Sequence, residues 1–139
     1  MKVNLIEHDP EYVKQLTFIK THLNLDINIL NNKFSENTNL KADIVLFLAL
    51  IHWVYNSTDS FKNLKDIINK LYTMTNKVLI IEWIDLSDQA ITSTDRIIQS
   101  EKNTDKYNKK NFISALQIFT KIEKKESDNK TRELYFCYI

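Results

Sequence analysis

Residues 1–10 read Met-Lys-Val-Asn-Leu-Ile-Glu-His-Asp-Pro, a pattern that predicts a strand running directly into a helix. Val3 to Ile6 form the short, mostly apolar strand. Asp9 can cap the helix because its carboxylate accepts the free N–H groups of the first turn. Pro10 suits the first helical position, where a missing N–H leaves no hydrogen bond unmade. A strand that ends in acidic residues and leads into a helix is typical of a nucleotide-binding sheet.

The chain contains no glycine in 139 residues, although average usage of about 7% predicts roughly ten. Abundant lysine, asparagine and isoleucine with a single proline indicate that codons have drifted toward A and T, which accounts for much of the deficit. The consequence for function is the same whatever the cause. Glycine-rich P-loops, dinucleotide fingerprints and the strained elbow of a serine nucleophile are all excluded.

The composition predicts one globular domain covering residues 1–139, because 43% of the residues are apolar and the length supports one core. A net charge of +1 gives no electrostatic footprint for nucleic acid or for an acidic membrane. Cys137 is the only cysteine, which excludes an internal disulfide and favours a reducing compartment, the cytoplasm. The longest apolar run, Ile44 to Tyr55, is too short to span a bilayer.

Helix and strand patterns alternate along the chain. The first predicted helix has its apolar stripe at three- and four-residue steps, and Asn24 can end it because asparagine tolerates the left-handed conformation. That stripe consists of Val13, Leu16, Ile19 and Leu23. The other expected elements are strands at 27–30, 42–51 and 77–85, a helix capped by 56–60 and buried along 61–71, a helix at 87–99, a short helix at 112–116, and a closing hairpin formed by 119–125 and 133–139.

The stretch from Ala42 to Ile51 is apolar at almost every position, so both faces of this strand are expected to be buried. Such a run indicates a central parallel strand that is covered by helices on each side. Together with the alternating order, it predicts an α/β fold. We expect a mostly parallel sheet flanked by helices and ending in an antiparallel β-hairpin.

This order resembles the class I (Rossmann-like) S-adenosylmethionine-dependent methyltransferases, entered at their second strand. Four segments carry the resemblance. Residues 5–13 look like the second strand and its helix, 42–53 are similar to the fourth strand, 77–85 look like the fifth, and 112–139 resemble the reversed sixth and seventh strands. The resemblance covers nearly the whole chain, and it depends mostly on the order of the elements and on the closing hairpin.

The family's first strand, the glycine-rich turn after it and the first helix have no counterpart here. A β-α-β unit would need about 30 further residues upstream of Met1 for them, so the chain is expected to be N-terminally truncated relative to the family. In the family the first strand lies between the second and the fourth. Its loss would leave two apolar strand edges unpaired. We therefore expect the strands of Glu7 and Asp43 to pair directly, or a homodimer or partner chain to complete the sheet.

Ligands of such sheets bind beyond the carboxyl ends of the strands, so the candidate residues are those at these ends. The resemblance implies that Glu7 holds the cofactor ribose and places Asn32 near the adenine, where the family often has an acidic residue. His52 and Trp53 combine an imidazole that titrates near neutrality with a ring that can stack on a flat ligand, although both could simply cover the sheet edge. Asp85 ends its strand and is expected beside them on the acceptor side.

These residues support two kinds of function. The first is an S-adenosylmethionine-dependent methyltransferase with weakened cofactor binding, in which His52, Trp53 and Asp85 act on the acceptor. The second is a non-catalytic Rossmann-like interaction subunit or pseudoenzyme. A third alternative is a degenerate response-regulator receiver domain, which residues 2–13 also resemble. Dispersed histidines give no support to a metal site.

Overall fold

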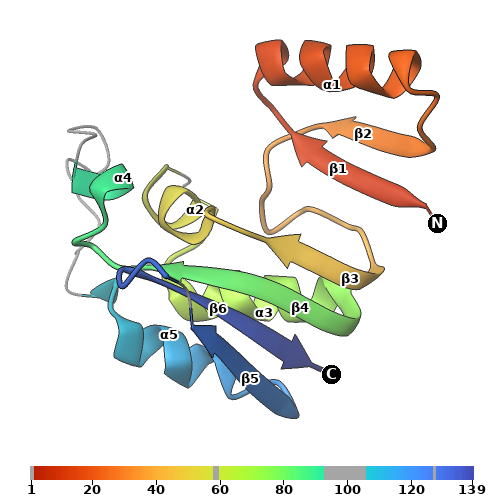
Figure 1. The fold of residues 1–139 in the computed structure, drawn as a ribbon. Coiled ribbons are helices and arrows are strands. Elements are labelled where there is room, and N and C mark those ends of the chain that lie inside the picture. The colour runs from red at the N-terminus through yellow and green to blue at the C-terminus, as the bar shows by residue number, and fades with distance from the viewer. Residues whose placement is uncertain (1, 58–59, 93–105, 127) are drawn as a thin grey trace. The chain divides into compact units, whose positions relative to one another are not determined.

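In a computed structural model of the chain, the structure describes residues 2–57, 60–92, 106–126 and 128–139. The chain divides into an N-terminal unit that ends at Asn37 and a C-terminal unit that begins at Thr38. Each unit has its own sheet. The elements of both are labelled in Figure 1.

The N-terminal unit is a β-α-β unit, formed by β1 (Val3–Glu7), α1 (Pro10–His22) and β2 (Ile27–Asn31). Its two strands pair in parallel. The predicted start of α1 is confirmed, because the Asp9 carboxylate accepts the backbone N–H of Glu11 at 2.8 Å and Pro10 is the first helical residue. Asn24 takes the left-handed conformation after the helix, with φ of 49°. The chain thus turns from α1 into β2 without a glycine.

The apolar stripe of α1 is less covered than the sequence predicts. Val13 and Leu16 are half-buried, whereas Ile19 is 44% and Leu23 is 59% exposed. No residue of α1 is fully buried. A two-stranded sheet offers too little surface to bury the whole apolar stripe of a helix of this length.

The C-terminal unit contains a four-stranded sheet in the order β3-β4-β6-β5. β3 (Ala42–Phe47) and β4 (Thr75–Ile84) are parallel, while β6 (Arg132–Tyr138) is antiparallel to both β4 and β5 (Lys121–Glu126). The predicted closing hairpin is therefore confirmed. The mixed α/β architecture, with parallel strands, flanking helices and an antiparallel pair at the end, matches the expected fold class.

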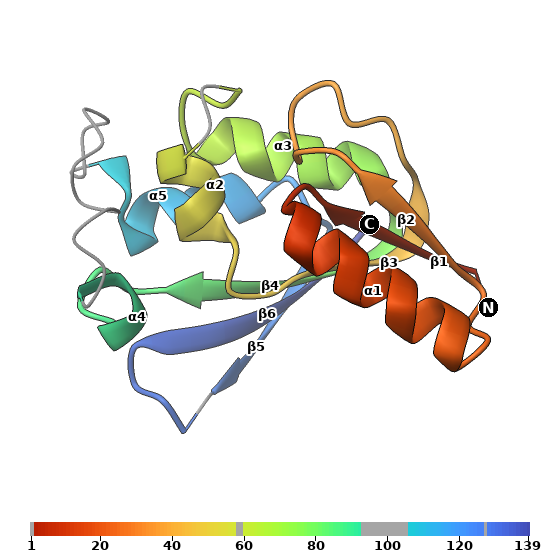
Figure 2. The same ribbon diagram turned by 90° about the horizontal axis from the view of Figure 1, so that it is seen from above.

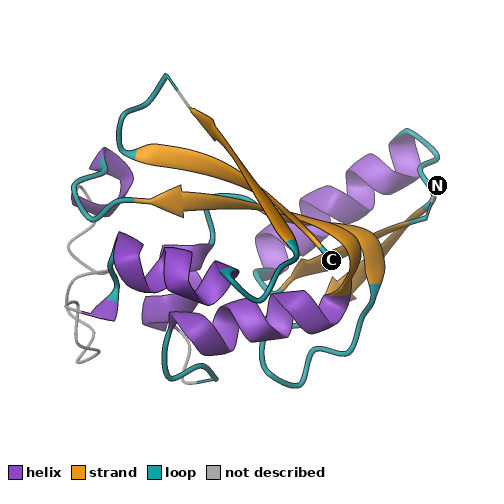
Figure 3. Cartoon of the chain, turned by 90° about the horizontal axis from the view of Figure 1, so that it is seen from below, coloured by secondary structure: helices purple, strands orange, loops and turns teal. Residues whose placement is uncertain are grey.

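The core of this unit lies between its sheet and helices α3 (Leu64–Met74) and α5 (Lys109–Leu116), which lie against the same face (Figure 3). Alternate residues of β4 point toward them, and Leu79, Ile81 and Trp83 are at most 2% exposed. The predicted buried stripe of the helix between 61 and 71 is confirmed. Its cap differs from the prediction, because Asn63 accepts the N–H of Asp66 at 3.0 Å. Figure 2 shows the same layers from above.

β3 differs from its prediction in length, position and burial. The strand ends at Phe47, and helix α2 (Ile51–Ser57) begins only four residues later, so His52 and Trp53 lie on a helix. β3 is an edge strand of its sheet, with Ile44 59% and Leu46 61% exposed. The expectation of a central strand covered on both faces was wrong. Apolar composition alone does not distinguish a strand that is covered on both faces from an apolar edge strand such as β3.

β1 and β3 belong to different sheets, so the direct pairing expected between the strands of Glu7 and Asp43 is not formed. The helix expected over 87–99 begins as α4 (Gln89–Thr92), and its remainder lies outside the described residues. Among the helices of the described residues, none is both long and apolar enough to cross a membrane.

Candidate functional site

The carboxyl ends of β3 and β4 lie at one edge of the four-stranded sheet, because the two strands are parallel neighbours. A tight turn follows β3 there. Ala49 in this turn has φ of 54°, a left-handed conformation that costs a residue with a Cβ roughly 1 kcal/mol or more. Its neighbours Leu48 and Leu50 are each 44% exposed. This strained, apolar turn forms the rim of the candidate site.

An ion pair between a buried carboxylate, Asp88, and the partly exposed Arg132 lies at the same end of the sheet. The Asp88 side chain, in a residue only 1% exposed, accepts hydrogen bonds from Nε of Arg132 at 2.9 Å and from Nη2 at 3.1 Å. The Thr131 hydroxyl donates to the same carboxylate at 2.5 Å. Nη1 of Arg132 lies 4.0 Å from Glu82. The guanidinium is thus fixed by two bonds to one carboxylate, and hydrogen bonding to Asp88 raises the pKa of Arg132.

His52 is buried on α2, with only 2% of its surface exposed. Its Nδ1 atom has no hydrogen-bond partner among the described residues. Burial, together with the positive charge of Arg132, lowers the pKa of His52 from 6.5 to about 4, against an opposing contribution from Asp88. The imidazole is therefore neutral at physiological pH, and it can accept or donate a hydrogen bond but carries no charge.

Trp53 and Asp85 flank this buried cluster. The Trp53 ring is 44% exposed, and its centroid lies 5.7 Å from that of His52. Oδ1 of Asp85 accepts from the backbone N–H of Ser87 at 3.0 Å and from the Ser87 hydroxyl at 2.7 Å. One carboxylate oxygen of Asp85 therefore stabilises the turn after β4. Oδ2 has no partner among the described residues, which leaves it able to accept a further hydrogen bond.

A buried aromatic stack supports the end of β4. Trp83 and Tyr107 are stacked with centroids 4.6 Å apart, and the Tyr107 hydroxyl donates to the Ile84 carbonyl at 2.8 Å. Phe112 also packs against Trp83, with the two ring centroids 5.0 Å apart. Burial raises the pKa of Tyr107 far above its usual range, so this hydroxyl is a structural donor. The stack fixes the position of Asp85, which directly follows Ile84.

The two residues predicted to bind a cofactor lie in the N-terminal unit, at the carboxyl ends of neighbouring strands. Oε1 of Glu7 accepts the backbone N–H groups of His8 at 2.7 Å and Asp9 at 2.8 Å. Oε2 has no partner in the part of the chain that the structure describes. Asn32 directly follows β2 and is exposed. Glu7 thus stabilises its own turn with one oxygen and keeps the other available.

The structure brings the predicted residues into two groups, His52, Trp53 and Asp85 in the C-terminal unit and Glu7 with Asn32 in the N-terminal unit. The sequence analysis missed Asp88 and Arg132, which lie 44 positions apart and meet only through the sheet. One signal was available for this pair. Arg132 is one of only two arginines in a lysine-rich chain, and arginine is the residue suited to a buried, two-bonded ion pair.

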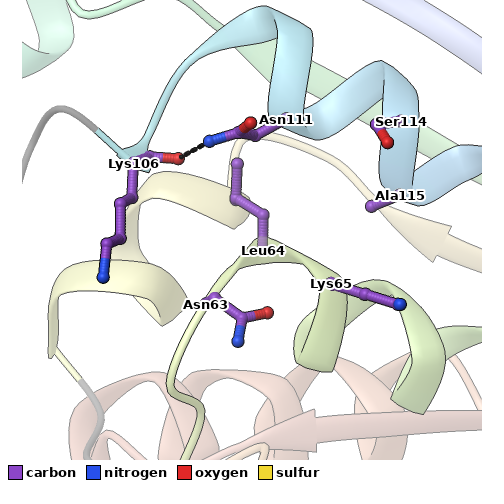
Figure 4. Close-up of a pocket in the computed structure, with 7 residues that line it drawn as sticks. All are labelled: Asn63, Leu64, Lys65, Lys106, Asn111, Ser114 and Ala115. Atoms are coloured by element: carbon purple, nitrogen blue, oxygen red, sulfur yellow. Dashed lines mark hydrogen bonds between the residues drawn. The ribbon is translucent and has the colours of Figure 1, made fainter.

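A cavity of about 320 Å³ opens elsewhere, between the starts of α3 and α5 (Figure 4). It is lined by Asn63, Leu64, Lys65, Lys106, Asn111, Ser114 and Ala115. Its lining includes none of the predicted site residues. Within the described residues, no group of three or more His, Cys, Asp or Glu side chains is placed to hold a metal ion.

The chain was compared with known families, curated proteins and solved structures. No family model matches it, and no curated protein matches its sequence. Solved structures do match. N-methyltransferase NodS from Bradyrhizobium japonicum WM9 is 12% identical with a TM-score of 0.59, covering 99% of this chain and 72% of its own. Magnesium protoporphyrin IX methyltransferase (ChlM) from Synechocystis PCC 6803, solved with bound SAH, is 10% identical with a TM-score of 0.64, covering 99% and 63%.

A possible exported protein from Bordetella parapertussis is also similar, at 13% identity and a TM-score of 0.69, over 99% of this chain and 53% of its own. The chain thus spans about half to three quarters of the length of these proteins. Its fold is that of the class I S-adenosylmethionine-dependent methyltransferases, which confirms the resemblance inferred from the element order.

Proposed function

We propose that this chain is an S-adenosylmethionine-dependent methyltransferase-like protein whose cofactor binding is weakened. The observation that supports this best is the likeness of 99% of the chain to solved methyltransferases. The second support is the group of polar and aromatic side chains at the carboxyl ends of β3 and β4, the edge at which ligands of such sheets bind.

On the cofactor side, the residues present fit only one part of S-adenosylmethionine. Oε2 of Glu7 can accept a hydrogen bond from a ribose hydroxyl, and the Asn32 amide can donate to or accept from the adenine. The amino-acid end of the cofactor would need close backbone approach, which a chain without glycine does not offer. We infer that the cofactor binds weakly, held mainly by its nucleoside.

On the acceptor side, we assign positioning roles to Trp53, His52 and Asp85. The exposed Trp53 ring offers a flat surface on which an acceptor can stack. Neutral His52 and the available oxygen of Asp85 can accept hydrogen bonds from the acceptor's hydroxyl or amine. The cofactor, when bound, supplies a sulfonium methyl group for in-line displacement. The contribution of the protein to such a transfer is chiefly orientation.

Calorimetric titration with S-adenosylmethionine and with its demethylated product tests this proposal. We expect weak binding that Glu7→Gln reduces by about tenfold, since a hydrogen bond to a charged group contributes roughly 1.5 kcal/mol or more. Glu11→Gln, which changes an exposed acid in the same unit, is the matched control. No heat release at millimolar ligand would refute an active methyltransferase.

A second candidate is a non-catalytic Rossmann-like interaction subunit, which the lack of glycine and the separate sheets of β1 and β3 support. In this case a second copy or a partner chain would complete the sheet. The buried lone thiol of Cys137 favours a reducing, cytoplasmic setting for either function. A strictly monomeric protein that recovers no partner in pull-down would count against this candidate. The receiver alternative is dropped, because the solved structures that the chain resembles include methyltransferases over 99% of its length.

A further inference from the structure

The cavity between the starts of α3 and α5 carries positive charge. Its lining contains two lysines, Lys65 and Lys106, and no carboxylate. In the part of the chain that the structure describes, neither of these ammonium groups has an ion-pair partner. Lys109, the first residue of α5, differs from them because its ammonium group lies 2.6 Å from the Glu133 carboxylate. The two lysines of the cavity therefore remain without a countercharge from the described residues.

The neutral polar side chains of the lining add hydrogen-bond donors. Nδ2 of Asn63 and Oγ of Ser114 donate to no described residue. Nδ2 of Asn111 is already used, because it donates to the Lys106 carbonyl at 3.0 Å (Figure 4). The cavity thus combines two cations with two unpaired neutral donors, a set of groups suited to bind an anion.

This positive charge comes from side chains and not from the start of α3. Oδ1 of Asn63 accepts the backbone N–H of Asp66 at 3.0 Å, and Oδ2 of Asp66 accepts the N–H of Lys62 at 3.2 Å. The Asp66 carboxylate therefore already offsets the positive end of the helix dipole. Asp66 is not part of the lining, so Lys65 and Lys106 determine the charge that faces the cavity.

The size of the cavity and its apolar residues indicate what kind of anion it suits. Its volume of about 320 Å³ is at the lower end of the range for small-molecule sites, roughly 300 to 1,000 Å³. Leu64 and Ala115 are buried and form its apolar part. The Leu64 side chain points from α3 toward α5, between Lys106 and Lys65 (Figure 4). A charged group attached to a small organic body would use both the lysines and this apolar part.

We propose that this cavity binds a small phosphomonoester, with the phosphate between Lys65 and Lys106 and the organic group against Leu64 and Ala115. A phosphomonoester carries nearly two negative charges at neutral pH, which matches two lysines, and its oxygens can also accept from the neutral donors. A carboxylate would match only one of the two charges. The inference goes beyond the methyltransferase-like function and does not rest on it, because S-adenosylmethionine contains no phosphate and no predicted site residue lines the cavity.

Titration of the isotope-labelled full chain with phenyl phosphate, followed by NMR, tests this site. We expect saturable shifts of the amide signals at the starts of α3 and α5, with a dissociation constant of about 1 mM. Lys65→Gln and Lys106→Gln should each raise this constant about threefold, as for other partly exposed charge pairs, and together about tenfold. Lys110→Gln changes an exposed lysine of α5 that does not line the cavity, and it should leave the constant nearly unchanged.

Two further measurements distinguish a site in the cavity from a general attraction between opposite charges. Ser114→Leu removes no charge but fills the space that the phenyl group needs, so it should weaken binding about tenfold. Benzoate has the same ring with a single negative charge, and it should bind about tenfold more weakly than phenyl phosphate.

Several results would overturn the inference. One is the absence of shifts up to about 20 mM phenyl phosphate, and another is benzoate that binds as tightly. Equal weakening by Lys110→Gln and Lys65→Gln, or unchanged binding in Ser114→Leu, would contradict it as well. Calorimetry with S-adenosylmethionine is independent of these results, so the methyltransferase proposal stands or fails separately.

Discussion

Acidification should destabilise the C-terminal unit through His52, and the sign follows from its environment. The folded state lowers the pKa of His52 from 6.5 to about 4, chiefly by burial. Between these two values the unfolded chain binds a proton that the folded chain does not. Stability is therefore fully present above about pH 6.5 and falls as the pH decreases toward 4.

The size of the effect follows from the same two values. A separation of about 2.5 pKa units corresponds to at most about 3.4 kcal/mol, the full loss being reached below pH 4. Between pH 7 and pH 5, protonation of the unfolded chain alone should cost about 2 kcal/mol. For a domain of this size that is a substantial part of the total stability.

Urea unfolding followed by tryptophan fluorescence measures this loss, because Trp53 and Trp83 both lie in the C-terminal unit. His52→Leu removes the titrating group. At pH 7 this variant should unfold within about 1 kcal/mol of the parent, since Nδ1 makes no hydrogen bond to a described residue that could be lost. At pH 5 it should be more stable than the parent by about 2 kcal/mol. His22→Gln replaces an exposed histidine on α1 and is the matched control.

The comparison between parent and variant cancels the carboxylates that titrate in the same range. A stability difference that stays constant from pH 7 to pH 5 would refute the buried, neutral state assigned to His52. Titration of the His52 ring by NMR gives an independent check. A ring that protonates near pH 6.5 in the folded protein would contradict the same reasoning.

Three further predictions concern other groups of the C-terminal unit. Asp88→Asn should destabilise the protein by about 2 kcal/mol in chemical unfolding, because it weakens the two charge-assisted hydrogen bonds that the partly exposed Arg132 donates to this buried carboxylate, and the change should cost much less in an Arg132→Met background. Burial acts to raise the pKa of Glu133, but hydrogen bonds from its neighbours hold it at about 2, so Glu133→Gln should cost about 2 kcal/mol at pH 7 and little below pH 2. Ala49→Gly should raise the free energy of unfolding by about 0.5 kcal/mol, seen as a slightly higher melting temperature, because it relieves the left-handed backbone, whereas Asn24→Gly should be close to neutral.

Local signals in the sequence predicted those parts of the fold that local chemistry determines. Asp9 and Pro10 specify the start of α1, since a cap and a first-turn proline act through neighbouring atoms. The stripe of α3 and the closing hairpin were predicted for the same reason. Apolar residues spaced by three and four positions predict a single helix, and alternation of apolar and polar residues predicts a single strand.

Features that depend on which elements meet could not be predicted in this way. The run from Ala42 to Ile51 is apolar at every position except Asp43, yet it divides into an edge strand, a strained turn at Ala49 and the first residue of α2. Nothing within ten residues of Asp88 indicates that Arg132 will be its partner. Position at a strand end is the reason for proposing His52, Trp53 and Asp85, but the structure places the first two on α2 and only Asp85 directly after its strand. The ion pair of Asp88 and Arg132 forms only because β6 returns antiparallel beside β4.

The lack of glycine affects the fold and the cofactor site to very different degrees. Among the described residues only Asn24 and Ala49 have positive φ, and each adopts the left-handed conformation although it carries a Cβ atom. The cost of that conformation is about 1 kcal/mol at Ala49, which a packed sheet can offset. Packing elsewhere cannot offset a Cβ atom in a cofactor pocket in this way, because at the point of closest approach the Cβ atom displaces the ligand itself. The fold can therefore persist in a chain without glycine, and the same lack of glycine is the reason why we propose weakened cofactor binding.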